Sequence, residues 1–213
     1  MTEGKKVKKA LLVIDMQNVC VGKNHATYFK YDNEILIQTV NEVIDANESN
    51  VVVYIKNIMK KNLINKLASF KAYEGTEEVE LVSNLHVISD YVFIKYEGNA
   101  FSNPKLNEFL KAHKIKCVEI VGVDGGGCVA LTALGAIKEG YSVILNESAI
   151  GTMFNKNKEA SRSRCKNYLD KYKALKTFSH AERLKATETL NFAFDDQNEN
   201  RYRCACFHKR CVT

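Results

Sequence analysis

The sequence has no apolar run long enough to cross a membrane, and several other features are also missing. No apolar segment approaches the roughly 20 residues of a membrane-spanning helix, so we expect no membrane partner. With one proline and 11 glycines in 213 residues, the composition is not that of a collagen. The basic start MTEGKKVKKA leads into an apolar segment that ends at Asp15, so we expect no secretory signal and a cytoplasmic location.

The composition is typical of a globular protein. Hydrophobic residues make up 46% and charged residues 26%, which excludes a disordered chain. The 31 basic against 25 acidic residues give a mild positive charge, and the basic residues are not interleaved with aromatic ones, so we expect no nucleic-acid partner. Without a signal peptide, the seven cysteines are expected to be reduced thiols rather than the staples of a disulfide-rich miniprotein.

Short apolar runs alternate with segments of helical spacing. The runs predict strands that are buried on both faces; they are residues 10–14, 51–55, 91–94, 117–123 and 141–145. Helices are predicted over 33–46, 104–112, 128–139 and 157–172, and a last strand over 174–178. The predicted buried faces carry Ile35, Leu36, Thr39, Val40 and Val43 in the first helix and Val129, Leu131, Leu134 and Ile137 in the third. This alternation predicts an open α/β sheet with right-handed crossovers.

The domain is expected to span residues 1–190, because periodicity ends there. Residues 191–213 form a basic, cysteine-rich tail that we expect to be flexible. Within the tail stand Cys204, Cys206, His208 and Cys211. Metal binding, a disulfide, docking of an acidic partner and a disordered reduced state all remain open for this cluster.

Three chemically active side chains stand where predicted strands end. Asp15 follows the first strand, Lys95 the third, and Cys128 begins a helix after the strand that ends at Val123. Because sites in open α/β sheets form beyond the carboxyl ends of strands, we expect an acid, an amine and a thiol to meet there. The alternatives are a loop-capping Asp15, a Lys95 that extends to solvent, and a Cys128 that only packs the junction.

Cys128 follows the glycine-rich turn GVDGGG. The positive end of the helix dipole is expected to lower the thiol pKa, and backbone N–H groups of the turn are suited to an oxyanion. The same glycines also suggest a dinucleotide site, but the G-x-G-x-x-G register is missing, and Glu147 lies past the next strand.

The segments VIDMQN, FIKYEGNAF and VGVDGGGCVALTALGA resemble the isochorismatase-like cysteine hydrolase family over residues 10–180. The resemblance implies a three-layer α/β/α fold with a central, mostly parallel sheet of Rossmann-like topology. It also implies an Asp15–Lys95–Cys128 triad that cleaves a C–N bond of a small amide, ureide or carbamoyl compound through a thioester. Further implications are a cis peptide bond between Val123 and Asp124, an oxyanion hole from the backbone N–H groups of Asp124 and Cys128, and a homo-oligomer.

The chain departs from the family at several positions. Gly125 and Gly126 replace a threonine and an acid, so side-chain support of the turn is expected to be missing. Cys20 stands where relatives carry a pocket aromatic residue, whereas Ala100 and Phe101 fit the pocket-lining segment. The stretch KNIMKKNLINK lacks the acid and histidines that hold a metal in nicotinamidases, so we expect no metal and no cofactor. A catalytically silent protein that binds a ligand or a partner remains the alternative to an enzyme.

Overall fold

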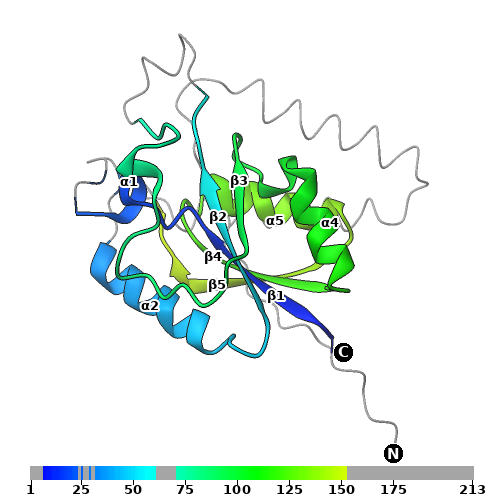
Figure 1. Ribbon diagram of the computed structural model, residues 1–213. Helices are drawn as coiled ribbons and strands as arrows, with labels where there is room; N and C mark the ends of the chain where they lie inside the picture. The colour runs from blue at the N-terminus through cyan, green and yellow to red at the C-terminus, as the bar shows by residue number, and fades with distance from the viewer. Residues whose placement is uncertain (1–6, 24, 26–28, 30–31, 61–70, 153–213) are drawn as a thin grey trace, which may run out of the picture.

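The computed structural model describes residues 7–23, 25, 29, 32–60 and 71–152. Within these residues, five strands form one sheet in the order β3-β2-β1-β4-β5, and all neighbours are parallel (Figure 1). The strands are β1 (Lys9–Ile14), β2 (Val51–Asn57), β3 (Val92–Lys95), β4 (Cys117–Gly122) and β5 (Ser142–Ile150). The predicted α/β fold with a mostly parallel sheet is confirmed.

Helices cover both faces of the sheet, as Figure 1 shows. They are α1 (Asn18–Val21), α2 (Asn33–Asp45), α4 (Pro104–Ala112) and α5 (Cys128–Lys138), together with the short 3₁₀ helices η1 (Glu77–Val79) and η2 (Ala100–Ser102). Because side chains alternate along a strand, Leu11 and Val13 of β1 pack on the α2 side. Leu12 and Ile14 pack on the opposite side, with α4 and α5. This alternation produces the three layers.

Local sequence signals set several helix ends. Asn103 accepts a hydrogen bond from the backbone N–H of Lys105 at 3.0 Å, and Pro104 occupies the first turn, as predicted for α4. Asp32 caps α2 in the same way through the N–H of Ile35 at 3.1 Å. The glycine after α5, Gly140, has a φ of +90°, which allows the chain to reverse there.

The predicted buried faces of two helices need correction. In α2 the buried residues are Leu36, Ile37, Val40 and Ile44, whereas Ile35 is 63% exposed. In α5 the fully buried positions are mostly small residues, and Leu131, Leu134 and Ile137 are only partly buried. Small residues are needed there because α5 lies very close to its neighbours: a Cβ on Gly135 would lie 2.3 Å from Asn99 Oδ1.

The strand β3 also differs from the prediction, because it lies at an edge of the described sheet. Its first residue, Val92, is 43% exposed rather than buried on both faces. The predicted helix 157–172, the strand 174–178, the boundary near residue 190 and the tail cysteines lie outside the described residues. Among the helices that are described, none has both the length and the apolar character needed to span a membrane.

Candidate active site

Asp15, Lys95 and Cys128 meet at the carboxyl end of the sheet. Asp15 directly follows β1, Lys95 is the last residue of β3, and Cys128 is the first residue of α5. The Lys95 ammonium donates a hydrogen bond to Asp15 Oδ2 at 2.9 Å and another to Cys128 Sγ at 3.1 Å. The three residues that the strand-end argument selected therefore form one contiguous cluster.

The ion pair in this cluster is shielded from water. Lys95 is 1% exposed and Asp15 is 3% exposed. Burial alone lowers the pKa of Lys95, but the charge of Asp15 and the hydrogen bonds of the ammonium outweigh burial and raise it above its usual range. Lys95 is therefore a permanent cation at neutral pH, and the alternative of a solvent-seeking side chain does not apply.

The backbone of Asp15 has an unusual conformation. Its φ of +51° lies in the left-handed region, which aspartate enters more readily than most residues other than glycine. The backbone N–H of Asp15 donates to the carbonyl of Ile55 at 3.0 Å, so the turn is tied to the end of β2. Beside it, a Cβ on Gly122 would lie 2.1 Å from the carbonyl oxygen of Ile14, so only glycine allows β4 to approach β1 this closely.

The two oxygens of the Asp15 carboxylate, Oδ1 and Oδ2, differ in their hydrogen bonds. Oδ2 accepts the hydrogen bond from Lys95, whereas Oδ1 is buried and accepts no hydrogen bond from the described residues. A hydrogen bond between the Asp15 carboxylate and the Cys128 thiol is among the causes that raise the pKa of the thiol, so the carboxylate is in contact with both other members of the cluster.

The expected low pKa of Cys128 is corrected by the structure. Burial raises the pKa of the thiol, the negative charge of Asp15 raises it further, and the positive charge of Lys95 lowers it. The net result is a pKa of about 12, opposite in direction to the expectation. In the resting protein Cys128 is a neutral thiol, and a base must remove its proton before it can act as a nucleophile.

The turn before Cys128 positions backbone donors. The peptide bond between Val123 and Asp124 is cis, as the family resemblance implied. The carbonyl of Asp124 accepts hydrogen bonds from the N–H groups of Gly127 and Val129, each at 3.0 Å. The N–H of Cys128 stands in the first turn of α5, where no carbonyl of the helix can accept it, and α5 has no side-chain cap. An anion next to Cys128 Sγ would meet this N–H.

Gly125 of this turn is supported by the end of β5 and the two residues that follow it. The N–H of Gly125 donates to the carbonyl of Gly151 at 2.8 Å. A Cβ on Gly125 would lie 2.7 Å from Thr152 Oγ1 and 2.8 Å from a methyl group of Ile150. The space of a side chain at position 125 is therefore already filled, so the turn is supported despite the lack of a side chain there.

Of the three predicted pocket residues, Cys20 interacts with the cluster, whereas the contacts of Ala100 and Phe101 are with other residues. Cys20 is buried in α1, and burial raises its pKa well above the usual value, with the Asp15 charge as the next cause. Ala100 is buried in η2, and its N–H donates to Thr132 Oγ1 at 3.0 Å. The Phe101 ring packs against Tyr141 with ring centroids 5.7 Å apart. A substrate-binding role for Cys20, Ala100 and Phe101 stays a prediction.

Two positioning residues were not identified from the sequence. The fully buried Gln17 side chain donates to the carbonyls of Val79 and Asn57 and accepts from the N–H of Asn57, so it links the loop after β1 to β2 and η1. Thr132 holds the segment after Lys95 against α5. The sequence could have indicated Thr132, because it stands four residues after Cys128 and therefore lies on the same face of the helix.

Within the described part of the chain, no group of three or more histidine, cysteine, aspartate or glutamate side chains is arranged to hold a metal ion. The stretch that departs from the nicotinamidase pattern is described only up to Lys60. The expectation that the protein uses no metal and no cofactor stays a prediction.

Together, the fold and the cluster define a three-layer α/β protein with an acid, an amine and a thiol on one rim of its sheet. The Isochorismatase domain family matches residues 9–171, and the chain belongs to this family. Among curated protein sequences the chain has no match.

Solved structures share the fold. An isochorismatase-like hydrolase from Alkaliphilus metalliredigens is 24% identical, with a TM-score of 0.62 over 77% of this chain and 91% of that chain. N-carbamoylsarcosine amidase from Thermoplasma acidophilum is 24% identical, with a TM-score of 0.63 over 74% and 92% of the two chains. A nicotinamidase/pyrazinamidase from Bacillus subtilis is 21% identical, with a TM-score of 0.63 over 70% and 90%.

Proposed function

We propose that this protein is a cysteine hydrolase that cleaves a C–N bond in a small amide, ureide or carbamoyl compound. The observation that carries the proposal is the contact of one buried ammonium, Lys95 Nζ, with both Asp15 Oδ2 and Cys128 Sγ. Family membership supports a hydrolytic role, and two of the structural neighbours are named as an amidase and a nicotinamidase.

In the first step, the thiol of Cys128 transfers its proton to Asp15 Oδ1, and Sγ attacks the carbonyl carbon of the substrate. A bond forms between Sγ and carbon, and the carbonyl oxygen becomes an anion. The N–H groups of Cys128 and Asp124 stabilise this oxyanion. Lys95 stabilises the negative charge on sulfur as the proton leaves, which offsets the high pKa of the resting thiol.

In the second step, the tetrahedral intermediate collapses and the C–N bond breaks. The proton held by Asp15 moves to the leaving nitrogen, which departs as ammonia or an amine, and the acyl group remains on Cys128 as a thioester. Asp15 is again a carboxylate and Lys95 again neutralises it. No group outside the Asp15–Lys95–Cys128 triad is needed to balance the protons.

In the third step, water attacks the thioester carbon while Asp15 accepts one of its protons. The C–S bond breaks, the carboxylic or carbamic acid product leaves, and the proton on Asp15 returns to sulfur. The resting thiol is regenerated, and the net reaction adds one water molecule across the C–N bond.

The proposal is tested by a screen for hydrolysis. The purified chain is incubated with a panel of amides, ureides and N-carbamoyl compounds, and released ammonia or amine is measured. The proposal is supported if turnover disappears in Cys128→Ala but persists in Cys117→Ala. The second variant is the control, because it removes a buried thiol at the start of β4. A thioester on the Cys128 peptide, trapped by acid quench and detected by mass spectrometry, supports the covalent step.

The alternative is a catalytically silent protein that binds a ligand or a partner through the same rim. The thiol pKa of about 12 favours this alternative, because such a sulfur is a poor nucleophile without a working base. If a compound from the panel binds, as judged by thermal stabilisation, and is never hydrolysed, the enzyme proposal is wrong and the binding protein is supported.

A further inference from the structure

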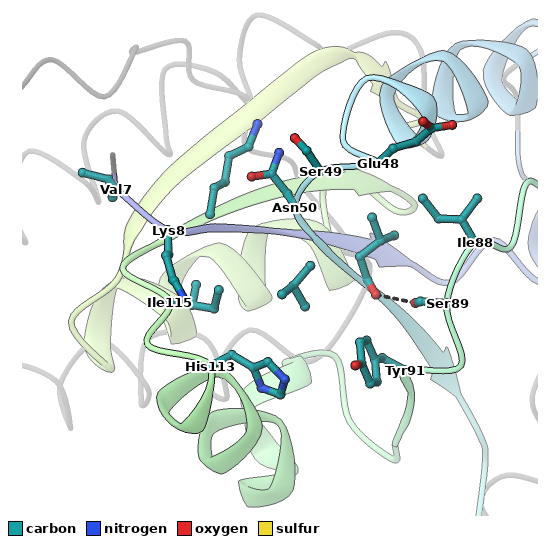
Figure 2. Close-up of a pocket in the computed structure, with 13 residues that line it drawn as sticks. Val7, Lys8, Glu48, Ser49, Asn50, Ile88, Ser89, Tyr91, His113 and Ile115 are labelled. Atoms are coloured by element: carbon teal, nitrogen blue, oxygen red, sulfur yellow. Dashed lines mark hydrogen bonds between the residues drawn. The ribbon is translucent and has the colours of Figure 1, made fainter. Parts of the chain in front are cut away.

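A hollow of about 540 Å³ opens at the amino end of the sheet, away from the Asp15–Lys95–Cys128 triad. Its lining residues come from the segments that precede the strands; they include Val7, Lys8, Asn50, Tyr91, His113 and Ile115 (Figure 2). The triad stands where strands end, so the hollow and the triad lie at opposite ends of the same parallel sheet. The hollow is therefore separate from the site of the proposed hydrolysis.

Contacts between side chains hold the walls of the hollow in place. Figure 2 shows Tyr91 beside His113, and their ring centroids are 5.9 Å apart. Both rings also contact Phe109 of α4, at 4.7 Å for Tyr91 and 4.1 Å for His113. Next to Tyr91, Ser89 Oγ donates to the carbonyl of Val52 at 2.6 Å. These contacts hold an aromatic wall in place over an aliphatic floor.

Exposed apolar side chains gather around this hollow. Of the seven large apolar side chains that are exposed among the described residues, five belong to the segments that surround it: Val7, Val87, Ile88, Tyr91 and Val92. The other two, Ile35 and Tyr96, stand on different elements. An exposed apolar cluster next to a concavity is typical of a surface that binds another macromolecule.

Positive charge borders the same hollow on the side of β1 and β4. Lys8, Lys114 and Lys116 are exposed there, and the N–H of Lys116 donates to the carbonyl of Lys8 at 3.0 Å, so the two residues are adjacent. Two other lysines of this region are already neutralised: Lys9 by Glu119 at 2.6 Å and Lys111 by Glu139 at 3.5 Å.

Two exposed acids, Glu48 and Asp90, lie in the segments before β2 and β3. Figure 2 places Glu48 on the far side of the hollow from Lys8. The surface is therefore polarised, with its basic side at β1 and β4 and its acidic side at β2 and β3.

We propose that this surface docks an acidic segment of a partner protein that inserts one aliphatic or aromatic side chain into the hollow. The anchor side chain would pack between Tyr91 and Ile115, and flanking carboxylates would meet Lys8, Lys114 and Lys116. A second copy of this chain would offer only Glu48 and Asp90 from its own polarised surface to the three lysines, and the test separates this outcome from binding of an acidic segment. A membrane is disfavoured because the apolar side chains surround a concavity instead of protruding from the surface.

The test is selection of a phage-displayed library of random 12-residue peptides on the full chain, followed by fluorescence anisotropy with the enriched peptides. We expect acidic peptides with a central aliphatic or aromatic residue, whose binding weakens with added salt. The variant Lys114→Glu/Lys116→Glu is expected to weaken binding at least tenfold. The matched control Lys71→Glu/Lys105→Glu changes charge equally at exposed positions near the opposite end of the sheet and is expected to bind as the wild type does.

Four results would overturn the proposal. The first is an enriched set of peptides without acidic residues. The second is equal binding by both charge variants when circular dichroism shows that both are folded. The third is sedimentation with phosphatidylserine vesicles that Lys114→Glu/Lys116→Glu abolishes, which would assign the surface to a membrane. The fourth is a self-associated species in analytical ultracentrifugation that the same variant dissociates, which would assign the surface to a second copy.

Discussion

Lys95 and Asp15 form an ion pair with a separation of 2.9 Å and almost no access to solvent. Each charge is expensive to bury alone, so removing either residue leaves an unpaired charge inside the protein. The pair also fixes the two partners of Cys128, because the ammonium that neutralises Asp15 also donates to the sulfur. Stability and the proposed chemistry therefore depend on the same contact.

Replacing Lys95 alone is expected to destabilise the protein. Lys95→Met leaves the Asp15 carboxylate buried without a counter-charge, and breaking a buried pair in this way costs about 3–5 kcal/mol. The double variant Lys95→Met/Asp15→Asn removes both charges and is expected to recover most of that loss. Urea unfolding at pH 7 measures both, and a double variant no more stable than Lys95→Met would contradict the dependence of one charge on the other.

The pH dependence of this stabilisation follows from the raised pKa of Lys95. A lysine whose folded pKa lies above its unfolded value of about 10.4 contributes its full stabilisation at lower pH. The contribution is lost as the pH rises through the folded pKa. Between pH 6 and 9 Lys95 stays protonated. We therefore expect that deprotonation of Lys95 does not reduce the difference in unfolding free energy between wild type and Lys95→Met over this range.

The reactivity of Cys128 is expected to separate from turnover in the Asp15→Asn variant. The Asp15 charge contributes to the raised pKa of about 12, so its removal lowers the pKa of the thiol. Each unit of that decrease raises the thiolate fraction about tenfold at a given pH below the pKa. Alkylation of the Cys128 peptide by iodoacetamide should therefore become faster, whereas hydrolysis should fall because the base is gone.

Mass spectrometry of each cysteine-containing peptide against pH checks this prediction, with Cys117 as the internal control. Slower alkylation of Cys128 in Asp15→Asn would show that the carboxylate does not raise the thiol pKa. Retained turnover in the same variant would remove Asp15 from the mechanism.

Gly135 is expected to tolerate replacement by alanine only when Asn99 is also replaced. A Cβ on Gly135 would meet the Asn99 amide, whose Oδ1 accepts the N–H of Phe101 at 2.9 Å. Gly135→Ala should therefore displace the segment after Lys95 and lower both stability and turnover. In an Asn99→Ala background the same change should instead stabilise α5 by about 1 kcal/mol, because alanine is the better helix former. Equal effects in both backgrounds, measured by thermal and urea unfolding, would disprove the coupling.

A chelator is expected to leave hydrolysis unchanged. The reason is that the proposed reaction balances its protons with Asp15 and Cys128 alone and that the described part of the sheet rim holds no cluster of metal ligands. Turnover is measured before and after dialysis against EDTA, with metal content determined by elemental analysis. Loss of activity that zinc or another divalent ion restores would show that a metal takes part.

The sequence predicted the fold and the meeting of Asp15, Lys95 and Cys128 because both follow from local patterns, whereas the catalytic roles of the three residues stay a prediction. Short β-branched runs marked the strands of a parallel sheet, and such a sheet brings its carboxyl ends to one rim. Asp15, Lys95 and Cys128 could therefore be grouped without knowing any distance, and the family motifs supplied the cis peptide bond between Val123 and Asp124.

Properties that depend on packing between distant segments were missed. The pKa of Cys128 is set by burial and by a carboxylate 113 positions earlier in the chain, and the helix dipole alone gave the wrong direction. The buried face of α5 follows from the close approach of Asn99 to Gly135, which no periodicity reveals. The support of Gly125 by Thr152 was also not predictable, because Thr152 lies in the segment after β5, far along the chain from the turn.

The left-handed backbone of Asp15 has an evolutionary consequence. A glycine at this position would relax the backbone and remove a buried charge, and the loss of Lys95 would then carry little penalty. A lineage under selection for stability alone would be expected to drift away from both residues. If the proposed hydrolysis is the function, the stability lost at Asp15 and Lys95 is the cost of placing a carboxylate and an ammonium beside the thiol of Cys128.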